Sequence, residues 1–130
     1  MHLESPRVTT QKSQQEMFDF LKNVENYKQV MPEGMEKFEV IASDTFLFTL
    51  KGMPQIALKI KETRQPDLVV LGSTSEKFPF SLNITVEAEG ENQSAVQLLF
   101  DGKFNAMMSM MVKGPLTKFI TNLSENMGKL

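Results

Sequence analysis

Residues 78–88 have the sequence FPFSLNITVEA, in which six apolar residues alternate strictly with mostly polar ones. A period of two is typical of a β-strand with one buried and one solvated face. Shorter alternating runs lie at 38–40, 46–50, 56–60 and 96–100. Residues 68–74 form a further run in which apolar and polar residues alternate less clearly. Because the connections between these runs are short, they predict an antiparallel meander with an apolar face and a wet face.

Helical spacing is found on both sides of this meander. Residues 13–16 (Ser-Gln-Gln-Glu) form a capping-box pattern, and Met17, Phe18, Leu21 and Val24 then recur at the spacing of one helix face. A second short helix is expected at about 25–29, ending before Pro32.

The apolar spacing becomes helical again from Asn105 to Met127. Such a helix is roughly 33 Å long, close to the roughly 34 Å of the strand at 78–88, so it can lie along the whole sheet. Pro115 would remove the hydrogen bond to the Met111 carbonyl, and we expect a kink or break there, which could act as a hinge for ligand entry.

Composition limits the classes of function. The chain has 130 residues, 41% hydrophobic and 23% charged, and a net charge of −2, which predicts a single domain over 1–130 and gives no overall basic field for nucleic acid. It has no cysteine, which excludes disulfides and thiol chemistry. No apolar run has the length of a signal peptide or membrane span, so we expect a cytoplasmic protein without a transmembrane segment.

The order of elements is a short strand within 3–10, two small helices, a six-stranded meander and a long C-terminal helix. Local cues are Val8-Thr9-Thr10 leading into 18–21, Asn26-Tyr27 running to Met31-Pro32, and the stretch 104–116 into Phe119. In this the chain resembles the helix-grip superfamily, whose members are also called START-like, polyketide cyclase-like or SRPBCC proteins. The resemblance implies an α+β fold in which a curved antiparallel sheet of about seven strands wraps the C-terminal helix.

The resemblance also implies an apolar cavity between sheet and helix. Alternation places nine side chains on the strand wall of that cavity: Phe46, Phe48, Leu58, Ile60, Phe80, Leu82, Ile84, Leu98 and Phe100. Helical spacing adds Met107, Met108, Met111, Leu116, Phe119 and Ile120, and the resemblance puts Tyr27 near the mouth. The methionines could equally fill gaps in a solid core or form an adaptable ligand surface.

Few residues offer catalytic chemistry. His2 is the single histidine and lies at the terminus, so no metal site, cofactor site or nucleophilic triad is predicted. Glu62 and Arg64 lie two and four positions after Ile60, so strict alternation would point them inward as well. They could form an ion pair with each other at the cavity rim. Enzymes of the resembled superfamily place polar or acid/base groups in the cavity, and this chain has few at inward positions.

We therefore expect non-catalytic binding or transport of a small hydrophobic ligand, of lipid, quinone, sterol-like or polyketide-like character. One alternative is a cyclase or dehydratase that uses Glu62 or Tyr27 as acid/base. The other is a protein- or membrane-interaction module with a filled core. It would use apolar residues of outward parity, namely Leu47, Val69, Leu71 and Leu99. This alternative also allows the chain to form a homodimer through these residues.

Overall fold

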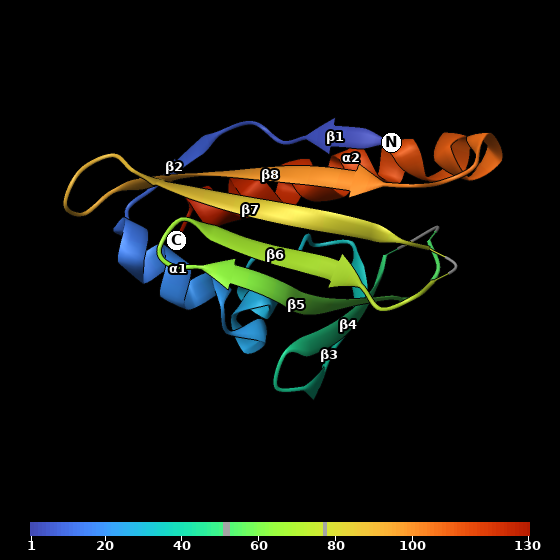
Figure 1. The fold of residues 1–130 in the computed structure, drawn as a ribbon, viewed down its shortest axis with the longest axis horizontal. Helices are drawn as coiled ribbons and strands as arrows, with labels where there is room; N and C mark the ends of the chain where they lie inside the picture. The colour runs from blue at the N-terminus through green and yellow to red at the C-terminus, as the bar shows by residue number, and fades with distance from the viewer. Residues whose placement is uncertain (51–52, 77) are drawn as a thin grey trace.

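The computed structural model describes residues 1–50, 53–76 and 78–130. In this part of the chain, eight antiparallel strands form one curved sheet with a long C-terminal helix packed along it (Figure 1). The strand order is β1-β8-β7-β6-β5-β4-β3, and β2 also pairs with β8. The strands are β1 (His2–Glu4), β2 (Val8–Thr10), β3 (Met35–Ala42), β4 (Thr45–Leu50), β5 (Ile56–Arg64), β6 (Leu68–Ser73), β7 (Phe80–Ala88) and β8 (Ser94–Gly102).

The N-terminal run forms two short strands because Pro6 interrupts it. Proline has no N–H to donate to a ladder, and β1 and β2 each pair with β8 on either side of this interruption. Ser5 bridges the gap, since its N–H donates to the Leu98 carbonyl at 2.9 Å and its hydroxyl accepts from the Leu98 N–H at 2.9 Å. The sheet therefore has one strand more than the seven predicted.

The two small helices are α1 (Gln14–Leu21) and the 3₁₀ helix η1 (Val24–Gln29). The predicted capping box is confirmed: the Glu16 N–H donates to Ser13 Oγ at 3.2 Å and the Ser13 N–H donates to Glu16 Oε1 at 3.1 Å. Hydrogen bonding of the Glu16 carboxylate, first to the backbone and then to the side chain of Ser13, lowers the pKa of Glu16.

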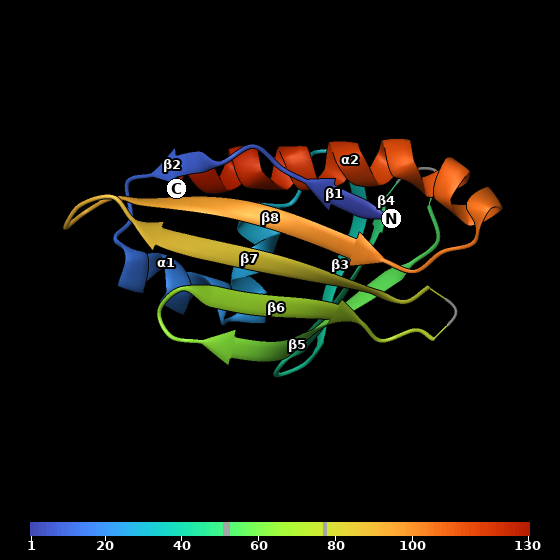
Figure 2. The same ribbon diagram turned by 45° about the horizontal axis from the view of Figure 1, so that its top comes forward.

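Helix α2 (Ala106–Gly128) runs alongside β8 for the length of the sheet (Figure 2). It begins at Asn105, whose side-chain oxygen accepts from the Met108 N–H at 2.8 Å. The helix continues through Pro115 without a break, because losing one backbone hydrogen bond does not end a long helix that is packed along its length. Figure 2 shows its first turns tilted from the line of the remainder.

The inner face of the sheet, α1, η1 and α2 enclose one hydrophobic core. The prediction that Val69 and Leu71 face outward is wrong, since both side chains are fully buried. The register pairs them with Ile84 and Leu82, and directly paired residues share a face of the sheet.

Candidate functional site

The inner faces of sheet and helix meet through a continuous stack of rings. Tyr27 of η1 stacks on Phe46 of β4 with ring centroids 5.0 Å apart, and Phe46 stacks on Phe48 at 6.0 Å. Phe48 in turn stacks on Phe119 of α2 at 5.1 Å. Along this line, sheet and helix are in direct contact.

The structure brings most of the predicted lining residues together in the core. On the strands, Ile60 and Phe80 are half-buried, and the others are almost fully buried: Phe46, Phe48, Leu58, Leu82, Ile84, Leu98 and Phe100. Leu116, Phe119 and Ile120 of α2 are buried against them. Phe80 also stacks on Phe100, with centroids 5.0 Å apart.

A groove with a volume of about 460 Å³ lies between α2 and the segment that joins η1 to β3. We call it the α2 groove. It is lined by Pro32, Glu33, Gly34, Leu50, Pro115, Lys118, Phe119, Asn122, Glu125, Asn126 and Lys129. Its α2 residues are three or four positions apart and so share one helix face. The volume lies within the range of small-molecule sites, roughly 300–1,000 Å³.

The α2 groove has an apolar base and a charged rim. Pro32, Leu50 and Phe119 are buried residues of its lining, and Phe119 continues behind it into the ring stack. The rim carries two exposed carboxylates, Glu33 and Glu125, and two exposed ammonium groups, Lys118 and Lys129. Such a lining suits a molecule with an apolar body and a polar end.

Asn126 holds the two walls of the groove together. Its Nδ2 donates to the Val30 carbonyl at 2.9 Å and to the Met31 carbonyl at 3.3 Å. These bonds attach α2 to the end of η1, directly before Pro32. The position of the 32–34 segment is thus set by an amide that belongs to the groove itself.

A second hollow, of about 220 Å³, lies near the N-terminal end of α2. It is lined by Pro54, Gln55, Ile56, Ala57, Ser73, Ser75, Phe78 and Met108. Half-buried Met108 is the α2 residue in this lining.

Comparison with known proteins identifies the fold. No protein-family model matches the sequence, and no curated protein matches it. Solved structures do match: one is a protein of Thermus thermophilus, with TM-score 0.74, 12% identity, and coverage of 98% of this chain and 94% of that one. A START superfamily protein of Mycobacterium smegmatis matches with TM-score 0.70, 10% identity, and coverage of 98% and 94%. Norcoclaurine synthase of Thalictrum flavum, in complex with dopamine and hydroxybenzaldehyde, matches with TM-score 0.69, 12% identity, and coverage of 96% and 84%.

The chain has the helix-grip fold. The matches to the Thermus thermophilus and Mycobacterium smegmatis proteins each cover 98% of this chain, so the similarity of fold includes all elements from β1 to α2. At identities of 10% to 12%, the similarity concerns architecture.

Within this helix-grip domain, Tyr27 does not border an opening, contrary to the prediction. It is fully buried, and its hydroxyl donates to the Leu21 carbonyl at 2.7 Å. Burial raises the pKa of the phenol well above its usual value, because the anion would lose its hydration. The phenol is therefore a neutral structural group at physiological pH.

The inward placement of Glu62 and Arg64 is also wrong. The β5–β6 register shifts between Ile60 and Glu62, so that Glu62 pairs with Val70 and the following Thr63 pairs with the buried Val69. One extra residue in a strand reverses the face of every residue after it. Glu62 is exposed on the outer face, and Arg64 pairs with Asp67, Nε to Oδ1 at 3.1 Å.

Two of the predicted methionine contacts are wrong for a different reason. Met107 and Met111 are 74% and 68% exposed, because the first turns of α2 extend past the end of the sheet (Figure 1). Met108 alone among the three predicted methionines faces a hollow.

Most of the α2 groove lies outside the residues that the sequence predicted for the site. Of its lining, only Phe119 was among the predicted site residues. A signal was present in α2, where residues 115, 118, 119, 122, 125, 126 and 129 share a face that is partly polar. The contribution of residues 32–34 could not be read, because it depends on contact between segments about 90 positions apart.

The described residues include no group of three or more His, Cys, Asp or Glu side chains placed to hold a metal ion. In the same part of the chain, no helix is long and apolar enough to cross a membrane.

Proposed function

We propose that this helix-grip protein binds a small, largely apolar molecule with one polar end, without transforming it. The α2 groove carries the proposal, because it combines a volume of about 460 Å³ with a buried apolar base and a charged rim. In this proposal, the apolar body lies against Leu50 and Phe119, and the polar end meets the rim. Lipid, quinone, sterol-like and polyketide-like molecules have this character.

The structural neighbours support binding of organic molecules by this architecture. The Thalictrum flavum enzyme is in complex with dopamine and hydroxybenzaldehyde, which are small aromatic molecules with polar substituents. Apolar area removed from water contributes roughly 25 cal/mol per Å² before the entropic cost of binding. An apolar body on Leu50 and Phe119 would gain this contribution, while its polar end stays hydrated at the rim.

Binding is favoured over acid/base catalysis by the positions of the ionisable groups. A catalytic carboxyl or ammonium group is expected in a site where burial or a close neighbour shifts its pKa. The four ionisable rim residues are exposed to solvent. The described groups that the enzyme alternative required, Glu62 and Tyr27, lie outside the groove lining.

Blocking the groove tests the proposal. Gly34 lines the groove, and a Cβ at this position would meet no atom within 4 Å. A side chain at position 34 therefore begins in open space, and we expect a Phe ring there to extend into the groove. Gly34→Ala is the matched control, since a methyl group leaves most of the volume free.

The probe is anilinonaphthalene sulfonate, which has an apolar body and an anionic end. We expect its fluorescence to increase with saturable binding to the wild type and to Gly34→Ala, and to be lost in Gly34→Phe. Native mass spectrometry of the purified protein, followed by organic extraction, would then identify a natural adduct. Equal dye binding by Gly34→Phe, with unchanged folding, would contradict the proposed site.

A further inference from the structure

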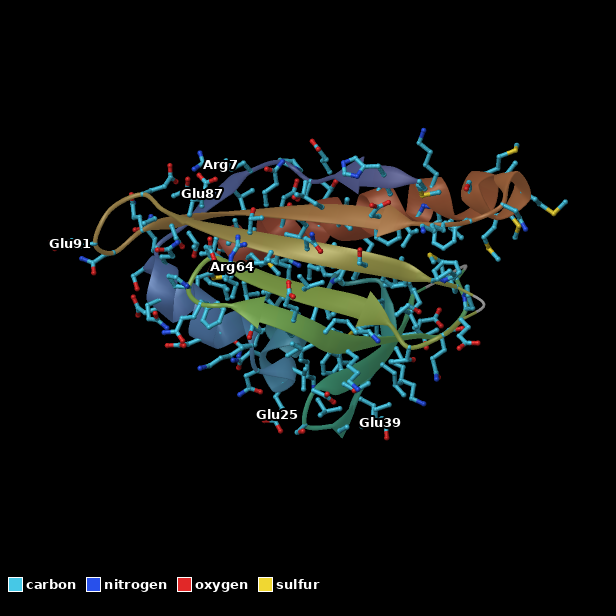
Figure 3. The ribbon with its side chains drawn as sticks, viewed as in Figure 1. Arg7, Glu25, Glu39, Arg64, Glu87 and Glu91 are labelled. Atoms are coloured by element: carbon cyan, nitrogen blue, oxygen red, sulfur yellow. The ribbon has the colours of Figure 1, made fainter. Side chains whose placement is uncertain are left out.

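The first turns of α2 carry three strongly exposed methionines. Met107, Met110 and Met111 are 74%, 84% and 68% exposed, and we call them the methionine tip. Their spacing of three and four positions places them on one side of the helix. Figure 1 shows these turns projecting beyond the end of the sheet, and Figure 3 shows side-chain sulfur atoms pointing outward there. An exposed group of large apolar side chains of this kind typically marks an interaction site.

The tip lies in a stretch of the chain whose charged residues are all basic, although the whole chain has a net charge of −2. Between Asp101 and Glu125, the sequence contains Lys103, Lys113 and Lys118 and no acidic residue. Lys103 and Lys113 are exposed and flank the tip on either side along the chain.

A second exposed apolar pair provides a contrast. Val40 and Ile41 of β3 are 36% and 51% exposed. Three acidic residues and one basic residue lie within a few positions of them, namely Glu36, Glu39, Asp44 and Lys37. The combination of apolar and basic character therefore distinguishes the tip from this pair.

We propose that the methionine tip docks on a membrane surface that contains anionic lipids. Unbranched thioether side chains adapt to irregular apolar surroundings. They can enter the boundary between headgroups and acyl chains, as the apolar faces of interfacial helices do. Lys103 and Lys113 then lie at the level of the phosphate groups, where each basic residue contributes to attraction. This inference does not rest on the proposed ligand-binding function.

A membrane suits this surface better than a second copy of the chain. In a symmetric dimer through the tip, the lysines of both copies would approach one another, and like charges in contact oppose association. Three methionine side chains are also too small a patch for a stable interface, which buries about 800 Å² of each partner. A lipid surface needs no matching patch of that size.

Flotation with vesicles tests the proposal on the full chain. The wild type should float with vesicles of phosphatidylcholine mixed with phosphatidylserine, and much less with phosphatidylcholine alone. The triple variant Met107→Gln, Met110→Gln, Met111→Gln should lose flotation, whereas the same triple change to Leu should keep it. Lys103→Gln and Lys113→Gln should each weaken binding by about fivefold.

The matched control is Val40→Gln with Ile41→Gln, which removes exposed apolar area elsewhere and should leave flotation unchanged. Because all five residues are exposed, these variants should fold like the wild type. Loss of flotation in the control, or flotation of the triple Gln variant, would overturn the assignment to the tip. Absence of flotation by the wild type would overturn the proposal, as would a concentration-dependent dimer that the triple Gln change dissolves.

Tryptophan fluorescence shows directly whether the tip enters the membrane. The chain has no tryptophan, so Met110→Trp introduces a single indole at the proposed contact and Ile41→Trp places one at the control site. Anionic vesicles should shift the emission of Met110→Trp to the blue and leave Ile41→Trp unchanged. Equal shifts, or none, would overturn the proposal, while dye binding by the α2 groove would be unaffected by either result.

Discussion

Tyr27 shows how burial decides what a single side chain can do. It is the one tyrosine of the chain, and its ring stacks on Phe46 while its hydroxyl bonds to the Leu21 carbonyl. That carbonyl belongs to the last residue of α1, where helix carbonyls have no partner within the helix. The phenol therefore satisfies a helix end and joins α1, η1 and β4.

Tyr27→Phe should keep the ring stack and remove this hydrogen bond. We expect a loss of about 1–3 kcal/mol in the free energy of unfolding at neutral pH, because a buried carbonyl loses its donor. Urea unfolding followed by circular dichroism measures the loss. A change near zero would mean that water reaches the Leu21 carbonyl.

The raised pKa of Tyr27 adds a second measurable effect. Above about pH 10 the phenol ionises in the unfolded chain but keeps its proton in the folded one. The unfolded state then holds fewer protons, so this contribution to stability is complete below about pH 10 and decreases as the pH rises. Stability of the wild type should fall more steeply in that range than stability of Tyr27→Phe, and identical slopes would contradict the buried phenol.

At the scale of elements, the sequence predicted which segments form strands and helices better than which faces they bury. Alternation and helical spacing were sufficient for β7, β8 and α2, because their apolar residues recur over many positions. The bulge in β5 was hidden, since after Ile60 no apolar residue remains in that strand to reveal a change of parity. The exposure of Met107 and Met111 was hidden as well, because the spacing within a helix does not show where the neighbouring sheet ends.

Gly114 lies in the interior of α2, directly before Pro115, and has no positive φ. Apart from its chain neighbours and the helix backbone, an added Cβ would meet no atom within 4 Å. The Pro115 ring disfavours helical dihedrals in a preceding residue that has a Cβ, and this opposes the gain in backbone entropy of about 0.4–1 kcal/mol that alanine brings. Gly114→Ala should therefore change the free energy of unfolding by less than about 1 kcal/mol. Thermal unfolding is a sufficient measurement.

Gly102→Ala is the contrasting variant. A Cβ at this position would lie 2.7 Å from the Phe104 ring and 3.1 Å from the Phe100 ring. We expect it to lower the free energy of unfolding by about 1–3 kcal/mol through overpacking. Destabilisation by Gly114→Ala of similar size would show that the contact of its Cβ with the Pro115 ring outweighs the gain in backbone entropy.

At the scale of the whole molecule, β8 connects the two ends of the chain. It pairs with β7 along one edge and with β1 and β2 along the other, and α2 packs beside β2 and β8. The Met1 ammonium group donates to the Gly102 carbonyl at 2.6 Å. Arg7, between β1 and β2, is joined to Glu87 of β7 by Nη2 and Oε2 at 2.7 Å (Figure 3). The N-terminal residues therefore form the outer strands beside β8, and α2 follows β8 directly in the chain.

If this N-terminal closure is part of the cooperative fold, removing its most buried apolar side chain should weaken the whole molecule. Leu3 of β1 is 9% exposed, belongs to the core and pairs with Phe100, whereas the side chain of its neighbour His2 is 59% exposed. Leu3→Ala should lower the free energy of unfolding by about 2 kcal/mol or more, and His2→Ala should change it by less than about 0.5 kcal/mol. Both are measured by urea unfolding, with hydrogen exchange at the Leu98 and Phe100 amides as a local probe. Equal, small effects of the two substitutions would mean that β1 detaches without unfolding the sheet, and β8 would then be an edge strand open to pairing with another chain.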